Sequence, residues 1–324
     1  MKRIIASALA ALLICACAGC GGYDMQLKEQ WRPKPTTEPT QSTPDATVPD
    51  VTDPEVPEQT EPDQSSDPTT EPTQPQPTEP QITPGTYQGI YTRAELEAMD
   101  RTVNGWGLGP YTDEDNRPVD ATRAQEKYGD YEAYFIVPDD GKIYLTFDEG
   151  YENGYTPQIL DVLKEKDVKA VFFVTMQYVK DEPELVQRMI DEGHVVGNHS
   201  VRHKSMPTLD VDTMISEVVD LHEYVLENFG YEMYLFRPPT GTYSEQSLAV
   251  LQELGYKSVL WSFAHYDYAV DDQPDPQKTY DKIVAAAHGG AIYLLHAVSK
   301  TNTEVLGDVI DAFRDQGFEL ALME

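Results

Sequence analysis

The sequence predicts an α/β fold, a distorted (β/α) barrel of about seven parallel strands that follows a signal segment and a disordered linker. Three observations lead to this prediction. Short apolar runs rich in β-branched residues alternate with amphipathic segments. The amphipathic segments carry start and stop signals of helices. About 240 residues of globular composition follow residue 86, a length at which a single α/β barrel is common.

The expected strands are the apolar runs. In chain order they cover residues 143–147, 170–175, 195–197, 234–236, 258–261, 291–295 and 318–322. A helix between successive strands implies parallel pairing through right-handed crossovers. The number of repeats favours a barrel or distorted barrel over an open sheet.

The expected helices cover residues 157–166, 184–193, 210–229, 244–254 and 302–316. Thr156 followed by Pro157 predicts a capped start for the first helix, and Pro183 opens the second. A glycine follows or ends four of these segments, at Gly193, Gly230, Gly255 and Gly317.

Residues 1–20 are expected to be a signal peptide. Lys2 and Arg3 precede an apolar run over residues 4–17 that is too short to span a bilayer comfortably. The run ends in CAGC, which resembles a bacterial lipobox with cysteine where leucine is usual. This resemblance implies lipidation of Cys20 and anchoring of an exported protein to the outer side of the cytoplasmic membrane. Ordinary cleavage and secretion is the alternative.

Residues 21–85 are expected to form a disordered spacer, because proline, threonine and acidic residues dominate and almost no aliphatic residue can be buried. The globular domain is expected over residues 86–324, with residues 86–141 as its N-terminal extension. We expect this protein to be a monomer.

The composition excludes two kinds of site. With 24 Lys+Arg against 56 Asp+Glu, the net charge of −32 repels nucleic acids. The three cysteines all lie within the first 20 residues, so the domain must hold any metal with histidines and carboxylates.

Ionisable residues follow five of the expected strands: Asp148 with Glu149, His199 with His203, Arg237, Asp267 and His296. In parallel α/β folds the strands deliver their C-terminal ends to one rim, which is where chemistry gathers. Their convergence therefore predicts an active site.

His199 and His203 are four residues apart. If the chain turns helical after the strand, both imidazoles project from one face and can share a metal. A packed or surface histidine pair is the alternative, and the acid pair at another strand end favours the metal. Two histidines with one carboxylate leave positions open for water and substrate, as in hydrolytic metal sites.

Five motifs carry a family resemblance: LTFDEG, NHSVRH, RPPTGTYS, WSFAHYDY and LLHAVS. Their order and strand-end positions, from about residue 143 to 322, resemble the NodB-type polysaccharide deacetylases of carbohydrate esterase family four. The wider strings YENGYT, YLFRPPTGTYSE and AIYLLHAVSKTN look most like the peptidoglycan de-N-acetylases that act on N-acetylmuramic acid and lead to muramic δ-lactam. GWGLGP and EKYGDYEAYFI, which lie upstream, look like the N-terminal extension of that subgroup.

The resemblance implies roles for the strand-end residues. Asp148 resembles the base that takes a proton from the attacking water, and Arg237 resembles the arginine that orients it. A structural ion pair is a second, compatible reading of Arg237. His199 and His203 resemble the two histidine ligands of a divalent metal, most simply zinc.

The acid half of the site is implied in the same way. His296 resembles the general acid that protonates the leaving amine, and Asp267 resembles the residue that holds its ring. The assignment of Asp267 competes with Asp271 and Asp272, which follow closely, and His265 lies nearby.

Glu149 departs from the family, in which a metal-ligating aspartate is usual and the δ-lactam subgroup resembles asparagine. Glu149 either ligates the metal after a loop adjustment or points into the substrate cleft and leaves a two-histidine site completed by water. The main-chain N–H of Thr240 is expected to help hold the oxyanion.

The resemblance implies a metal-dependent hydrolase that removes N-acetyl groups from N-acetylmuramic acid of peptidoglycan. Within enzymes, the alternatives are N-acetylglucosamine of peptidoglycan or chitin-like chains, and acetylated xylan. A non-catalytic glycan-binding relic is the alternative of another class.

Overall fold

The computed structural model describes residues 88–323. The expected signal peptide, its Cys20 and the expected spacer lie outside the described residues, so they remain predictions. Over residues 88–323, no helix combines the length and apolar character that a bilayer span requires.

The main feature of the domain is one sheet of nine strands, in which every neighbouring pair is parallel. The order is β2-β8-β6-β5-β4-β3-β10-β9, and β11 pairs with β3. The strands are β2 Ala133–Tyr134, β3 Lys142–Glu149, β4 Val171–Val174, β5 Val195–Asn198, β6 Leu235–Phe236, β8 Lys257–Val259, β9 Phe263–Ala264, β10 Ala291–His296 and β11 Glu319–Ala321. A separate antiparallel pair joins β1 Asn104–Gly105 to β7 Thr242–Tyr243.

The parallel barrel-like sheet confirms the predicted fold class. All seven predicted strands are present, and the structure adds the two-residue strands β2 and β9 at the two ends of the order. These end strands are not paired with each other, so the described strands form a curved sheet that hydrogen bonds do not close into a ring.

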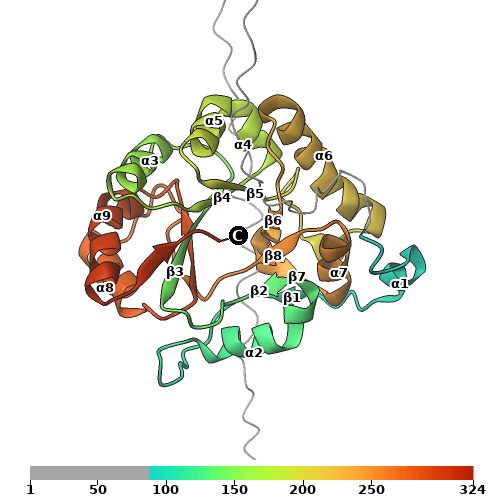
Figure 1. Cartoon of the computed structure of the whole chain (residues 1–324), viewed down its shortest axis with the longest axis horizontal. Helices are drawn as coiled ribbons and strands as arrows, with labels where there is room; N and C mark the ends of the chain where they lie inside the picture. Colours follow the sequence, from blue (N-terminus) through green and yellow to red (C-terminus); the bar gives the residue numbers. More distant parts are fainter. Residues whose placement is uncertain (1–87, 324) are drawn as a thin grey trace, which may run out of the picture. The chain divides into compact units, whose positions relative to one another are not determined.

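The helices lie on the outer side of the curved sheet (Figure 1). They are α1 Arg93–Ala98, α2 Val119–Tyr128, α3 Thr156–Glu165, α4 Met176–Asp181, α5 Pro183–Asp191, α6 Val211–Phe229, α7 Glu245–Glu253, α8 Pro276–Ala285 and α9 Lys300–Asp315. Three 3₁₀ turns complete the set, at η1 Gly129–Tyr131, η2 Met206–Thr208 and η3 Pro239–Gly241. The five predicted helices correspond to α3, α5, α6, α7 and α9.

The predicted cap of α3 is wrong. Tyr155 occupies the N-cap position without a side-chain hydrogen bond, and Thr156 is the first helical residue. The hydroxyl of Thr156 donates to Glu149 Oε1 over 3.4 Å. The Thr156 hydroxyl therefore hydrogen-bonds a residue at the end of β3 and does not cap its own helix.

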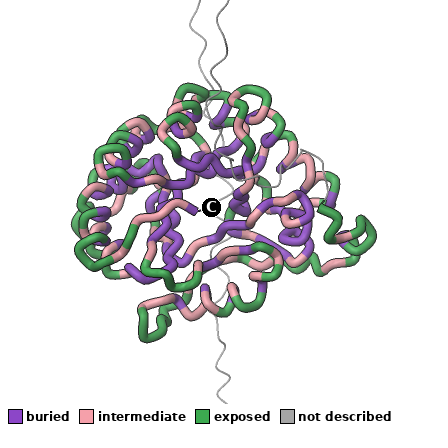
Figure 2. The backbone as a smooth tube through the Cα atoms, in the orientation of Figure 1, coloured by how far each residue is buried: buried purple, intermediate pink, exposed green. Residues whose placement is uncertain are grey.

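The core has two layers because side chains alternate along each strand. On β3, Leu145 and Phe147 pack towards the helices, whereas Tyr144 belongs to a second cluster inside the curve of the sheet. On β4, Phe172 and Phe173 divide in the same way. Figure 2 shows most of the central strands as buried. The same alternation fixes the directions of the two acids that end β3.

A buried carboxylate ties down the start of the described chain. Glu253, at the end of α7, is fully buried and accepts hydrogen bonds from the N–H groups of Gly89, Ile90 and Tyr91 at 2.7 to 2.8 Å. These three hydrogen bonds hold the main chain of residues 89–91 against the end of α7.

Candidate active site

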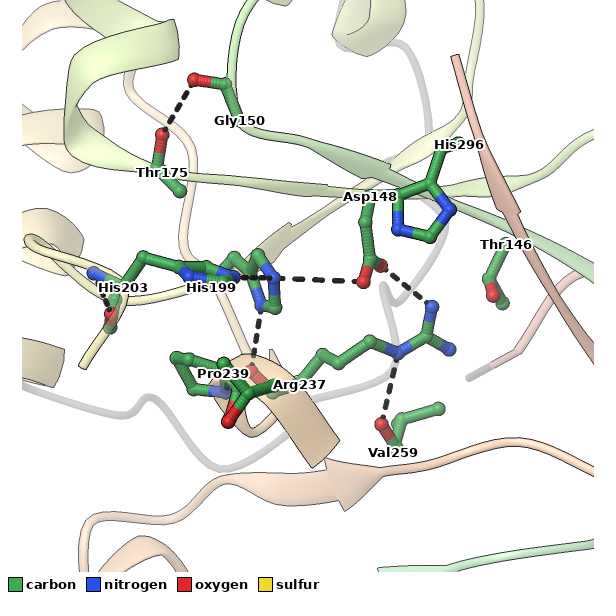
Figure 3. A network of polar contacts seen from close by, with 12 residues as sticks. Thr146, Asp148, Gly150, Thr175, His199, His203, Arg237, Pro239, Val259 and His296 are labelled. Atoms are coloured by element: carbon green, nitrogen blue, oxygen red, sulfur yellow. Dashed lines mark hydrogen bonds and ion pairs between the residues drawn. The ribbon is translucent and has the colours of Figure 1, made fainter. Parts of the chain in front are cut away.

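The residues predicted to act as general base and general acid lie on neighbouring strands. Asp148 and His296 are direct register partners in the β3·β10 pair. Asp148 follows the alternation that points Tyr144 and Thr146 inward, so its carboxylate faces the inside of the sheet. Figure 3 shows His296 beside Asp148, on the side away from His199.

Asp148 is held by one strong ionic contact. Arg237 Nη1 donates to its Oδ1 over 2.8 Å, and only 11% of the Asp148 side chain is exposed. Burial by itself would raise the pKa of Asp148, but the guanidinium of Arg237 together with His199 and His296 outweighs it and lowers the pKa below its ordinary value. The carboxylate is therefore ionised and can accept a proton.

Arg237 is fully buried and its own donors are occupied. Nε donates to the carbonyl of Val259 over 3.1 Å, and Nη2 to that of Leu260 over 3.3 Å. The guanidinium carbon lies 4.2 Å from the ring centre of Phe173. Arg237 can thus have a structural role and also orient the base, because the same buried guanidinium binds Asp148 and the carbonyls at the end of β8.

The two histidines converge, although the chain does not turn helical between them. Residues 199–205 form an irregular loop in which Ser200 and His203 have φ of 68° and 52°. This backbone brings His203 Nε2 within 3.0 Å of His199 Nε2. His199 Nδ1 donates to the carbonyl of Arg237 over 2.8 Å, so Nε2 is the unprotonated nitrogen of the neutral ring, and it lies 3.6 Å from Asp148 Oδ2.

Both imidazoles are neutral. Burial lowers the pKa of His199, and burial together with His199 lowers the pKa of His203 to about 3. Neutral imidazole nitrogens are the donors that a divalent metal such as zinc takes. The pair therefore fits a metal ion.

Side-chain hydrogen bonds from within the loop and from its neighbours fix this histidine geometry. Asn198 Oδ1 accepts from the N–H of Ser200 over 2.8 Å, and Ser200 Oγ accepts from the N–H of His203 over 2.9 Å. Glu217 of α6 is fully buried and accepts from the N–H and the Nε of Arg202 over 2.7 and 2.6 Å.

Asp267 is the acid that contacts the ring of His296. His296 Nδ1 donates to Asp267 Oδ1 over 2.7 Å, and the His296 main-chain N–H donates to Oδ2 over 2.9 Å. Burial alone would lower the pKa of His296, but the charge and hydrogen bond of Asp267 together with the charge of Asp148 outweigh it, and the pKa is raised. His296 can therefore carry a proton near neutral pH.

Glu149 is not placed beside the histidines, which corrects the expectation that it ligates a metal or enters the cleft. Neighbouring strand residues point to opposite faces, so Glu149 projects towards the helices when Asp148 projects inward. Its side chain is fully buried, Oε1 accepts from Thr156, and Oε2 has no hydrogen-bond partner among the described residues. Burial raises its pKa well above the ordinary value.

The geometry thus leaves a two-histidine donor pair. Over residues 88–323, no three His, Cys, Asp or Glu side chains form a ready metal cage. Thr240, the expected oxyanion donor, is exposed in η3 with a φ of 60°. Nothing in the described contacts tests its role.

Comparisons with known proteins agree with this site. The sequence profile of the family described as "Polysaccharide deacetylase" matches residues 136–259. The chain is 41% identical over 228 residues to the peptidoglycan-N-acetylmuramic acid deacetylase PdaA of Bacillus subtilis (strain 168), covering 69% of this chain and 86% of the relative. The chain belongs to the polysaccharide deacetylase family. Deacetylases of this family are metal-dependent in general.

Two solved structures are also similar to this deacetylase. That of Bacillus subtilis PdaA, a family 4 carbohydrate esterase, has a TM-score of 0.65 at 39% identity and covers 68% of this chain and 95% of the other. A family 4 carbohydrate esterase from Bacillus anthracis has a TM-score of 0.57 at 35% identity and covers 69% and 95%.

Sequence reasoning missed two buried residues at the site of this deacetylase. Glu217 lies within α6 and contacts the histidine loop, a partner that no local pattern signals. Asn302 contacts Asp267 from the first turn of α9. Its only signal was its place at the end of the string AIYLLHAVSKTN.

Proposed function

We propose that this deacetylase hydrolyses the N-acetyl group of N-acetylmuramic acid in peptidoglycan. One observation carries the proposal: the register of β3 and β10 sets an ionised Asp148 beside a proton-carrying His296, each with its own charged partner. The muramic acid substrate is supported by the name of the Bacillus subtilis relative, which the chain matches over 86% of its length.

Asp148 acts as the general base. Its carboxylate accepts a proton from water while the water oxygen forms a bond to the acetyl carbonyl carbon. Arg237 keeps the carboxylate ionised and fixes its direction through the 2.8 Å contact. The main-chain N–H of Thr240 donates to the carbonyl oxygen as negative charge develops there.

His296 acts as the general acid. Its Nδ1 is engaged by Asp267, so Nε2 is the nitrogen that delivers a proton to the amide nitrogen of the sugar. The bond between that nitrogen and the acetyl carbon breaks, and the products are the free amino sugar and acetate. A base and an acid with opposite protonation needs predict a bell-shaped pH profile.

His199 and His203 would hold the metal, for which we propose zinc. When bound there, zinc supplies Lewis acidity for the carbonyl and for the attacking water. The two neutral Nε2 atoms, the 2.8 Å contact of His199 Nδ1 with the Arg237 carbonyl and the fixed loop support this assignment.

We further propose that the protein is exported as a monomer and anchored in the membrane through a lipid on Cys20. The CAGC string after an apolar run supports the anchor. Attachment to the outer side of the cytoplasmic membrane would place the enzyme beside its cell-wall substrate.

The deciding experiment is acetate release from purified peptidoglycan, followed by mass spectrometry of the digested glycan. We expect loss of acetyl from muramic acid, with Asp148→Asn about 10²–10⁴ slower because it lacks the base. Deacetylated glucosamine, or activity on chitin oligomers or acetylated xylan alone, would support the alternative substrates. Glycan binding without acetate release would indicate a non-catalytic relic.

A further inference from the structure

Two buried polar residues stand behind the His296–Asp267 pair, and the proposed mechanism does not use them. Asn302 is 2% exposed, and the side chain of His265 is 3% exposed. Asn302 lies in the first turn of α9, where Ser299 Oγ accepts from its N–H over 3.1 Å. The helix cap thus fixes the position from which the Asn302 side chain reaches the acid pair.

The carboxamide of Asn302 bridges three groups. Its Nδ2 donates to Asp267 Oδ2 over 2.6 Å and to the carbonyl of His296 over 3.4 Å. Its Oδ1 lies 3.0 Å from His265 Nε2. An ionised carboxylate can only accept, so the amide nitrogen must face Asp267 and the amide oxygen must face the histidine. His265 must therefore donate from Nε2.

These bonds run in one direction towards the carboxylate. His265 donates to Asn302, Asn302 donates to Asp267, and His296 donates to Asp267 from its ring and from its main chain. Both oxygens of Asp267 are thereby engaged, and the side chain is fully buried. A buried carboxylate that accepts several hydrogen bonds is stabilised in its ionised form.

We propose that Asn302 and His265 are positioning residues for the general acid, because they orient and hold ionised the carboxylate that fixes the ring of His296. This inference rests on the proposed function for the role of His296. Neither residue touches the reacting atoms; both act through Asp267. The titratable and charged groups that face His296 come from several parts of the chain: Asp267, His265 and Tyr268 after β9, Asp148 on β3, Arg237 after β6, and His199 and His203 after β5.

The test uses the full chain with ¹³C-labelled histidine. Asn302→Ala should lower kcat by about 10- to 100-fold through loss of alignment, with KM and zinc content little changed. The NMR titration of the His296 ring should show a lower pKa than in the wild type. Thr303→Ala is the matched control, because Thr303 donates to the Ser299 carbonyl in the same turn and does not contact Asp267.

A second pair of variants keeps the test decisive if Asn302→Ala does not fold. Glutamine places an amide donor near the position of Nε2, so His265→Gln should retain most of the activity and the high His296 pKa. His265→Ala should lose both. Equal kcat and His296 pKa in His265→Ala, His265→Gln and the wild type would overturn the proposal.

The titration separates this inference from the proposed function. A wild-type protein that releases no acetate from any glycan would refute the function, yet the His296 pKa would still report whether Asn302 and His265 act on it. If the wild type is active and substitution of Asn302 or His265 changes neither the His296 pKa nor kcat, only the inference is refuted.

Discussion

At the scale of single residues, the last two positions of β3 have opposite environments. Asp148 faces inward against a guanidinium, whereas Glu149 faces the helices without a cationic partner among the described residues. The first is held ionised and the second is driven towards its neutral form. Adjacent carboxyl groups on one strand thus differ in chemistry because the strand alternates.

The metal assignment gives the first prediction. His199→Ala or His203→Ala should reduce bound zinc and turnover together, because each removes half of the histidine donors. Metal content is measured by elemental analysis after dialysis, alongside acetate release. His194→Ala, which changes a buried histidine that hydrogen-bonds Ala170, serves as the control. A variant with full zinc and full turnover would contradict the assignment.

Glu149 gives a prediction about stability and pH. Its folded pKa is raised, so the folded protein keeps a proton that the unfolded chain releases. This contribution is complete below the ordinary carboxyl pKa and is lost as the pH rises through the folded value. Glu149→Gln cannot ionise, so its melting temperature relative to the wild type should rise from pH 5 to pH 8.

The control for that experiment is Glu165→Gln, which changes an exposed glutamate in α3. Its melting-temperature difference from the wild type should stay constant over the same range. A constant difference for Glu149→Gln as well would show that the buried carboxyl group does not govern this pH dependence.

At the scale of elements, β5 must pass very close to β4. A Cβ atom on Gly197 would lie 2.5 Å from Cδ1 of Phe173, a buried ring that packs under the Arg237 guanidinium. Glycine is therefore required at this point of the strand. The close approach links the packing of two strands to the position of the base.

Gly197→Ala should consequently lower stability and activity together. Overpacking of this kind costs about 1–3 kcal/mol, measured by urea unfolding. A displaced Phe173 should shift Arg237 and reduce kcat. Gly307→Ala in α9 is the control, because its Cβ would meet other atoms at 3.5 Å or more. Equal stability of the two variants would contradict the proposed constraint.

The predictability of these elements follows from how each is stabilised. Seven strands and five helices have local signals, namely an apolar run for each strand and an amphipathic pattern with a start or stop residue for each helix, and these were predicted. The short strands β2 and β9 depend on pairing with β8 and β10, which no local pattern encodes. The chain after His199 is not helical, because Asn198 and Glu217 hold a loop with two positive φ angles.

The candidate site was likewise predicted only in part. Motif order identified the ionisable side chains that the structure gathers on β3, β10 and the loops beside them. It could not give the direction of Glu149, because that depends on which face of β3 meets the helices. It also could not reveal Asn302, whose partner Asp267 is 35 positions away in the chain.

At the scale of the whole molecule, the domain carries its own core. The buried cluster begins at Leu96, and Glu253 fixes the main chain from Gly89 to Tyr91. Deleting residues 24–84 should therefore leave the melting temperature and the activity on soluble glycan fragments unchanged within error. A shorter deletion of residues 24–54 is the control, and a marked loss in the longer deletion alone would show that residues 55–84 support the fold.

The β3·β10 pairing has a consequence for the order in which the protein gains activity. Thr146 donates to the carbonyl of Tyr293 across 147 positions of the chain, and the same ladder seats His296 beside Asp148. Contacts between such distant segments form late in folding, since a long loop must close first. A nascent or refolding chain can thus acquire most of its helices while it still lacks an acid next to its base. During refolding, turnover should therefore recover later than the helical circular-dichroism signal. The return of enzymatic activity would report that β3 and β10 have paired.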